Sequence, residues 1–148
     1  MISIDLYGEP TPMNRPRFAR TKKSFVCYDN QSKIKEGFKW QIKSQYRESP
    51  LICPVVIDVS FYMPIPKSTP KRILNHMQLG QYHHIKKPDI DNLQKFLLDC
   101  LNGILFVDDS QVIEIRARKI YSSKVGTFIR VMPQQEIIAH ERDHANSS

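Results

Sequence analysis

The chain has 148 residues, 41% of them hydrophobic, which is the size and composition of one folded domain and excludes a disordered chain. Its 22 Lys and Arg outnumber its 15 Asp and Glu, and the resulting charge of +7 favours a polyanionic partner. It has no run of 18 apolar residues and no signal-peptide pattern, so we expect a cytoplasmic protein that does not span a membrane.

The first half of the chain predicts a strand, a helix and a second strand. Residues 2–7 alternate between apolar and polar side chains, as a half-buried strand does, and Gly8 ends the pattern. Residues 32–46 carry apolar side chains four positions apart beside a stripe of lysines, which predicts an amphipathic helix with a basic face. Residues 54–62 alternate again and predict a strand, and the prolines that follow indicate a long loop over residues 64–85.

A second helix is predicted over residues 91–102. Its apolar side chains recur at positions i, i+3, i+4, i+7 and i+8, which places them on one face. Asp91 is expected to cap the start of this helix with Gln94 returning a bond, and Gly103 is expected to end it.

The remaining pattern predicts two more strands and completes the fold. Residues 112–121 and 125–132 are joined by Ser-Ser-Lys and are expected to form an antiparallel hairpin. The order β-α-β-α-β-β predicts an α+β fold, a single domain over residues 1–132 in which helices pack against one mixed sheet. Residues 133–148 are expected to form a polar tail.

Charge is distributed unevenly along the chain. Residues 10–48 contain ten basic and three acidic side chains, and residues 67–87 contain five basic side chains and no acidic one. Residues 88–109 reverse the sign, with five aspartates and one lysine. Two like charges about 4 Å apart repel by about 4 kcal/mol at an effective dielectric constant of about 20. If the fold gathers these carboxylates, a bound cation is the simplest relief.

The segment Lys-Pro-Asp-Ile-Asp-Asn-Leu-Gln-Lys, which contains Asp89 and Asp91, is the most informative. If residues 88–91 are extended, both carboxylates point to one side, and Lys95 lies one helical turn beyond Asp91. A lysine beside two carboxylates can hold a phosphate. The aspartate pair at 108–109 could be returned to the same site by the fold. Oxygen ligands without Cys or His favour Mg²⁺, with Mn²⁺ as a possible substitute.

The same residues have a plain structural interpretation. Asp-x-Asp-Asn at a helix start is often only a cap, and Asp-Asp-Ser is often only a turn. Asp99 is expected to pair with Lys95 rather than to bind a metal. Taken one at a time, these motifs favour a structural role; together, within a basic protein, they leave a structural and a catalytic role equally open.

The order and spacing of these residues resemble those of a known family. From Lys87 the chain reads K-P-D-I-D-N-L-Q-K-F-L-L-D-C-L-N-G, followed by F-V-D-D-S-Q-V and by a lysine at position 119. With Gly8-Glu-Pro and Arg15-Pro-Arg near the N-terminus, this arrangement resembles the RusA family of Holliday junction resolvases, which is common in phages and prophages. The resemblance reaches over most of the first 132 residues. The chain differs from shorter members in residues 64–85 and in its tail.

The resemblance implies a homodimeric, Mg²⁺-dependent endonuclease that cuts symmetrically across a four-way DNA junction in recombination and repair. It implies that Asp89, Asp91 and Asp109 are the essential carboxylates of the metal site and that Lys95 is the catalytic lysine. Asp108 lies beside this set and is expected to face the ion less well than its neighbour. Paired cuts on a two-fold symmetric junction also require two sites at fixed separation, which a homodimer supplies.

The basic residues are expected to bind the backbone of branched DNA without reading its sequence. A solvated helix face is an equally good interpretation of the lysine stripe. Phe18 and Tyr28 could stack on unpaired bases at the junction, although packing explains them as well. The residues predicted to bind DNA are Arg15, Arg17, Arg20, Lys35, Lys39, Lys43, Lys86, Lys87 and Lys119.

Other functional classes are less well supported. A non-catalytic DNA-binding protein with a structural acidic cluster remains open, and a nucleotide phosphohydrolase would not need so large a basic surface. His140-Glu-Arg-Asp-His144 fits the zinc-protease pattern, but it lies in the tail without a third ligand. Pro88-Asp89 resembles the start of the P-D…(D/E)-x-K nuclease pattern, but no such second half follows. The three cysteines form no C-x-x-C pair, which disfavours a disulfide framework or a zinc ribbon.

Overall fold

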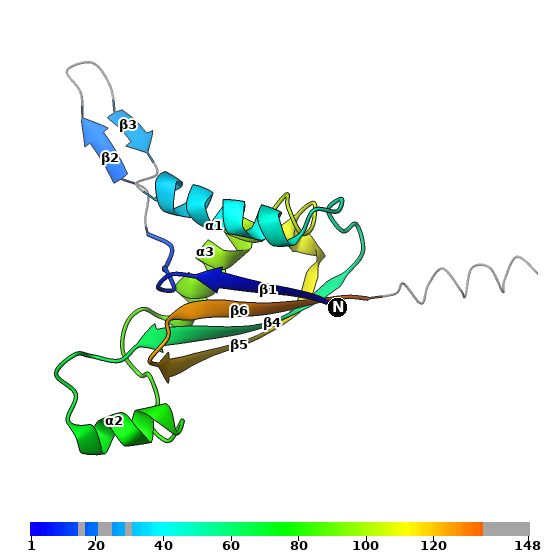
Figure 1. Ribbon diagram of the computed structural model, residues 1–148. Coiled ribbons are helices and arrows are strands. Elements are labelled where there is room, and N and C mark those ends of the chain that lie inside the picture. The colour runs from blue at the N-terminus through cyan, green and yellow to red at the C-terminus, as the bar shows by residue number, and fades with distance from the viewer. Residues whose placement is uncertain (15–16, 21–24, 29–30, 135–148) are drawn as a thin grey trace, which may run out of the picture.

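A four-stranded mixed sheet forms the centre of the molecule (Figure 1). The computed structural model describes residues 1–14, 17–20, 25–28 and 31–134, with only the backbone for 17–20 and 25–28. The sheet has the order β1-β6-β4-β5, with β4 and β5 parallel and the other neighbours antiparallel. Its strands are β1 (Ile2–Tyr7), β4 (Val55–Pro64), β5 (Val112–Ser122) and β6 (Gly126–Pro133).

Two helices, α1 (Ser32–Gln45) and α3 (Ile90–Leu101), cover one face of this sheet (Figure 1). Their apolar sides meet over the core, where the rings of Phe38 and Phe96 pack edge to face with centroids 5.8 Å apart. After α3, Gly103 has a φ of +81°, a left-handed conformation that suits the predicted helix end. The predicted α+β class and single mixed sheet are confirmed. Within the described ranges, no helix is long and apolar enough to cross a membrane.

The predicted hairpin of the last two strands is wrong. β5 and β6 do not pair with each other, because β4 lies between them, parallel to β5 and antiparallel to β6. Alternation of apolar side chains determines which face a strand buries but not which strand lies beside it. β6 instead pairs with both β4 and β1. Gly126 allows its close approach to β1, since a Cβ there would lie 2.9 Å from the Leu6 carbonyl oxygen.

Three elements of the structure were not predicted from the sequence. The predicted loop of residues 64–85 contains α2 (Lys71–Gln78), a short helix that follows Pro70 and buries Met77. β2 (Arg17–Arg20) and β3 (Phe25–Tyr28) form an antiparallel ribbon that projects away from the sheet (Figure 1). β2 and β3 have four residues each and α2 has eight, so each segment is too short for its pattern to be distinguished from that of a loop.

Side chains of α1 close the β1 edge of the sheet. Gln45 accepts a hydrogen bond from the Asp5 N–H at 2.8 Å and donates one to the Asp5 carbonyl at 2.7 Å. Gln41 makes the equivalent pair with Tyr7, at 2.7 and 3.1 Å. The backbone groups of Asp5 and Tyr7 at this edge are therefore satisfied within the chain, and the other edge strand is β5.

Candidate active site

Asp89 and Asp91 lie at the N-terminal end of α3. Asp89 precedes the helix with extended dihedral angles, and its carbonyl accepts the Leu93 N–H at 3.2 Å. Asp91 lies within the first turn, so two predictions are wrong: Asp91 is not the cap, and residues 88–91 are not extended throughout. The Asp89 side chain makes no capping hydrogen bond, and both aspartates are exposed. The positive end of the helix dipole thus faces two solvent-accessible carboxylates.

Lys95 lies one turn beyond Asp91 in α3 and is exposed. The spacing of four residues places the two side chains on the same side of the helix. Asp99 was expected to pair with Lys95, and this is wrong, because its carboxylate lies 2.8 Å from the Lys35 ammonium of α1. Helix packing, which sequence spacing within one helix does not reveal, provides this partner.

An open groove of about 380 Å³ lies beside Asp89. Its walls come from the segment after β1 and from the start of α3, and the Met13 N–H donates to the Asn92 carbonyl at 2.9 Å to join them. The buried Gln31 side chain supports the first wall, since it accepts the Asn14 N–H at 3.0 Å and donates to the Pro12 carbonyl at 2.7 Å. The groove is lined by Pro12, Met13, Asn14, Lys87, Pro88, Asp89 and Asn92.

Lys119, on the helix-covered face of β5, contacts the backbone beside the groove. Its ammonium donates to the carbonyl oxygens of Lys86 at 2.9 Å and Pro88 at 3.0 Å. The Lys87–Pro88 peptide bond between them is cis. Lys119 therefore contacts the backbone that leads directly into Asp89.

Asp108 and Asp109 lie in the turn before β5. Asp109 begins a short 3₁₀ helix, Asp109–Gln111, and Asp108 is its N-cap. The Asp108 carboxylate accepts the Ser110 N–H at 3.1 Å, and the Gln111 side chain accepts the Asp108 N–H at 2.9 Å. This reciprocal pair is a capping box, and the hydrogen bonding from Ser110 lowers the pKa of Asp108. Asp108 thus has a structural role in the turn, as the plain interpretation of Asp-Asp-Ser predicted.

The start of β5, which follows this turn, and the start of α3, which follows Asp89, lie toward opposite ends of the sheet (Figure 1). β5 leads from Val112, just after the turn, to Lys119, which contacts the Asp89 loop. A strand rises about 3.3 Å per residue, so the two ends are roughly 20 Å apart, and the twelve-residue α3 spans a similar distance. Consistently, no three His, Cys, Asp or Glu side chains of the described ranges are grouped so that they could hold a metal ion. One chain brings Asp89, Asp91 and Lys95 together, but not Asp109.

The predicted DNA-binding residues differ in their surroundings. Lys43, Lys86 and Lys87 are exposed, whereas Lys39 is half-buried. Only 12% of the Lys35 side chain is exposed, and its ion pair with Asp99 makes it part of the interface between two helices. Arg17 and Arg20 lie on β2, where only the backbone is described; Arg15 and the His140–His144 motif lie outside the described residues.

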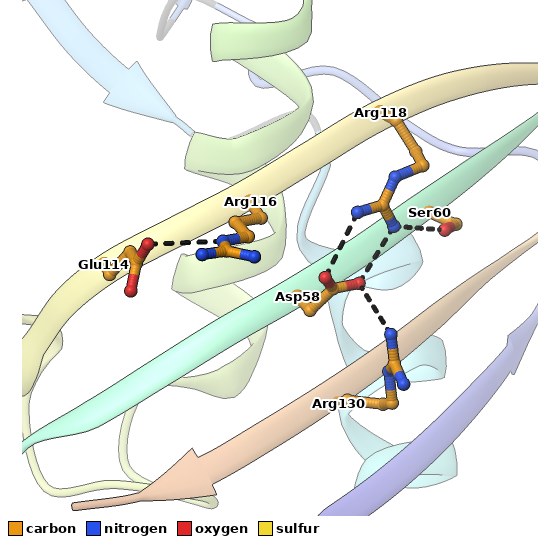
Figure 2. Close-up of polar contacts among 6 residues, drawn as sticks. All are labelled: Asp58, Ser60, Glu114, Arg116, Arg118 and Arg130. Atoms are coloured by element: carbon orange, nitrogen blue, oxygen red, sulfur yellow. Dashed lines mark hydrogen bonds and ion pairs between the residues drawn. The ribbon is translucent and has the colours of Figure 1, made fainter.

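A charged cluster that was not predicted from the sequence lies on the sheet face opposite the helices (Figure 2). Asp58 of β4 accepts two hydrogen bonds from Arg118 of β5, at 2.9 and 3.1 Å, and lies 3.5 Å from Arg130 of β6. Arg118 also donates to the Ser60 hydroxyl at 2.8 Å. The hydrogen bonds from Arg118 hold the pKa of Asp58 below its usual value. The cluster ties three strands together across the sheet.

Comparisons with known proteins identify a family and a relative. A family profile described as "Endodeoxyribonuclease RusA" matches residues 7–132, which include both ends of β5 and all of α3. The chain is also 35% identical over 127 residues to "Uncharacterized protein YqaN" of Bacillus subtilis (strain 168). That match covers 83% of this chain and 89% of the relative.

Proposed function

Because the chain belongs to the RusA family of endodeoxyribonucleases, we propose that it cuts Holliday junctions with a divalent metal ion bound at the N-terminal end of α3. Family membership makes it a nuclease of branched DNA; the metal, its ligands and the subunit arrangement are the parts proposed here. The observation that carries the proposal is that Asp89 and Asp91 are exposed together beside Lys95 and the groove.

The residues at this end of α3 suit Mg²⁺. Carboxylate oxygens are the ligands that Mg²⁺ prefers, and Asp89 is not occupied by capping the helix. Asp89 and Asp91 would hold the ion, and Mn²⁺ would be accepted by the same oxygens. When bound, the ion would supply an activated water and cover the charge that develops on the phosphate.

The chain's own cations would act on the DNA. Lys95, on the same side of α3 as Asp91, would hold the scissile phosphate by its ammonium and stabilise the charge of the transition state. Lys87 lines the groove and is exposed, so it would contact a neighbouring phosphate and contribute salt-dependent affinity. Lys35 is excluded from this role by its ion pair with Asp99.

We further propose a homodimer in which Asp109 of the partner completes each site. Within one chain, β5 keeps Asp109 roughly 20 Å from Asp89, so a shared ion requires Asp109 from another subunit. Exposed apolar side chains surround the Asp109 turn: Ile52 is 86% exposed, Val107 57% and Ile113 64%. Apolar groups of this kind are typical of a contact surface. A two-fold axis would then create two equivalent sites.

A junction-cleavage assay tests the proposal. A synthetic four-way junction and a linear duplex of the same sequences are incubated with the protein in Mg²⁺, Mn²⁺ or EDTA. We expect paired cuts in the junction with either metal and none in EDTA. Asp89→Asn and Asp91→Asn should abolish cutting but retain junction binding, whereas Asp5→Asn, an exposed carboxylate on β1, should cut normally. Metal-independent binding without cutting would instead support a non-catalytic DNA-binding protein.

A further inference from the structure

Lys119 occupies a position in β5 where its neighbours are apolar or aromatic. It is paired in register with Phe61 of β4, a core residue that is 2% exposed. Two positions on, Tyr121 faces the same side and is 7% exposed. Lys119 is half-buried, and its ammonium next to these groups is stabilised by hydrogen-bond acceptors, because removing a charge from water without a partner is costly.

The acceptors are two backbone carbonyls of the segment that leads into α3. Lys119 Nζ lies 2.9 Å from the Lys86 oxygen and 3.0 Å from the Pro88 oxygen. The Pro88 carbonyl belongs to the peptide unit that Pro88 shares with Asp89. On its other side, the Asp89 carbonyl is held by the Leu93 N–H of α3. The backbone of Asp89 is therefore fixed on both sides, once by β5 and once by the helix.

A second contact anchors the same segment to β5. His84 is 7% exposed, and its ring packs on that of Tyr121 with centroids 5.0 Å apart. Two positions on the same face of β5 therefore hold this segment. Tyr121 contacts His84, and Lys119 contacts residues 86 and 88. Together these contacts attach the end of the segment 64–85 to the sheet.

We infer that Lys119 is a positioning residue, whose ammonium holds the Pro88–Asp89 backbone so that the Asp89 carboxylate is aimed at the metal site. The inference rests on the proposed role of Asp89 as a metal ligand. It assigns Lys119 a different role from the DNA contact that the sequence predicted, because its ammonium is directed at two carbonyls of its own chain. Such a residue acts on the reaction rate rather than on DNA affinity.

The test separates these two roles. Single-turnover cleavage of a junction in Mg²⁺ is measured at saturating protein, and the junction Kd is measured in Ca²⁺ at several salt concentrations. Lys119→Met has an unbranched side chain one atom shorter than that of lysine and no donor. It should lower the single-turnover rate by about 10-fold to 100-fold, the size expected for a displaced catalytic group. The Kd and its salt dependence should stay unchanged. Lys119→Arg, which can donate to both carbonyls, should recover part of the rate.

Lys87→Met provides the contrasting variant, because Lys87 lies on the same segment but is exposed in the groove. It should raise the Kd and reduce the salt slope by about one phosphate contact. Mn²⁺ binding to the protein without DNA, followed by electron paramagnetic resonance, adds a readout apart from activity, and Lys119→Met should weaken it.

Several outcomes would overturn the inference. One is that Lys119→Met raises the Kd and reduces the salt slope as Lys87→Met does, with a normal saturated rate. Another is that Lys119→Met and Lys119→Gln both unfold at the assay temperature, since the lysine would then stabilise the whole fold. If the wild-type protein cuts no junction in Mg²⁺, the proposed function itself fails. A wild type that cuts, together with a Lys119→Met variant of normal rate, removes only the inference.

Discussion

A subunit with Asp89→Asn and a subunit with Asp109→Asn should regain nuclease activity when they form a mixed dimer. Each variant alone lacks one carboxylate in both of its sites and should not cut. In the mixed dimer, one site carries both defects. The other site combines the intact Asp89 of the second subunit with the intact Asp109 of the first, so that it is complete.

The distances in the structure determine this outcome. Bonds from Mg²⁺ to oxygen are about 2.1 Å long, so carboxylates that share an ion lie within about 5 Å of each other. β5 and α3 each separate Asp89 from Asp109 by roughly 20 Å within one chain. Rotation of aspartate side chains cannot close that gap. If Asp109 binds the same ion, as we propose, it must come from a second subunit.

The two variants are purified separately, mixed in equal amounts and allowed to exchange subunits. Random exchange gives about half mixed dimers, and each has one intact site of two, so nicking should reach about one quarter of the wild-type rate. Nicked junctions should accumulate, because resolution needs two cuts. The matched control mixes Asp89→Asn with Asp91→Asn. Both defects then affect the same half of the site in either subunit, and no intact site can form.

Failure of the first mixture to cut, when native mass spectrometry shows that mixed dimers are present, would refute the trans arrangement. Asp109 would then act within its own subunit after a large rearrangement of β5, or would not be a ligand. Recovery in the control mixture would refute it equally. That result would indicate that Asp89 and Asp91 do not act at one site.

Three further predictions concern stability and reactivity. Asp58→Ala should lower the free energy of unfolding in urea by about 1–2 kcal/mol, because it removes the carboxylate that Arg118 and Arg130 share. Glu114→Ala, at an exposed ion pair, should lower it by less than about 0.5 kcal/mol. Burial lowers the pKa of His84 below its usual 6.5, so the unfolded chain takes up the proton at a higher pH than the folded one. The free energy of unfolding should therefore fall as the pH drops below 6.5. His84→Phe should flatten that fall when unfolding in urea is measured across this pH range. Burial raises the pKa of the Cys100 thiol to about 12, so a Cys27→Ser protein at about pH 8 should show one reactive thiol when folded and two after unfolding.

The sequence predicted the elements whose periodicity is strong and long. The apolar stripe of α3 and the glycine after it defined that helix almost to the residue. The partners of β5 and β6 could not be predicted in the same way, because the alternation of apolar side chains does not show which strand lies beside which. Partner choice depends on close approach and on the length of connections, such as the contact of Gly126 with Leu6. Those are properties of the assembled sheet.

The candidate site shows the same division. The sequence predicts that Asp89, Asp91 and Lys95 lie close together, because all three lie at the start of one helix, within two turns. The interactions of Lys35 and Lys119 could not. Each is a lysine in a basic stretch or strand, yet one pairs with Asp99 on another helix and the other binds two carbonyls from a distant segment. Only the packing of α1 and β5 against α3 reveals these partners.

In the proposed dimer each chain contributes Asp89, Asp91 and Lys95 to one site and Asp109 to the other. β5 then runs from one site to the other and is held extended by its pairing with β4. The length of this strand therefore sets the separation of the two sites. A metal ion at either site also binds both subunits at once. Metal binding and dimerisation must therefore favour each other, since a ligand that binds only the assembled form stabilises that form. Chelation should loosen the dimer, and dilution of the protein should weaken its hold on the metal to the same extent.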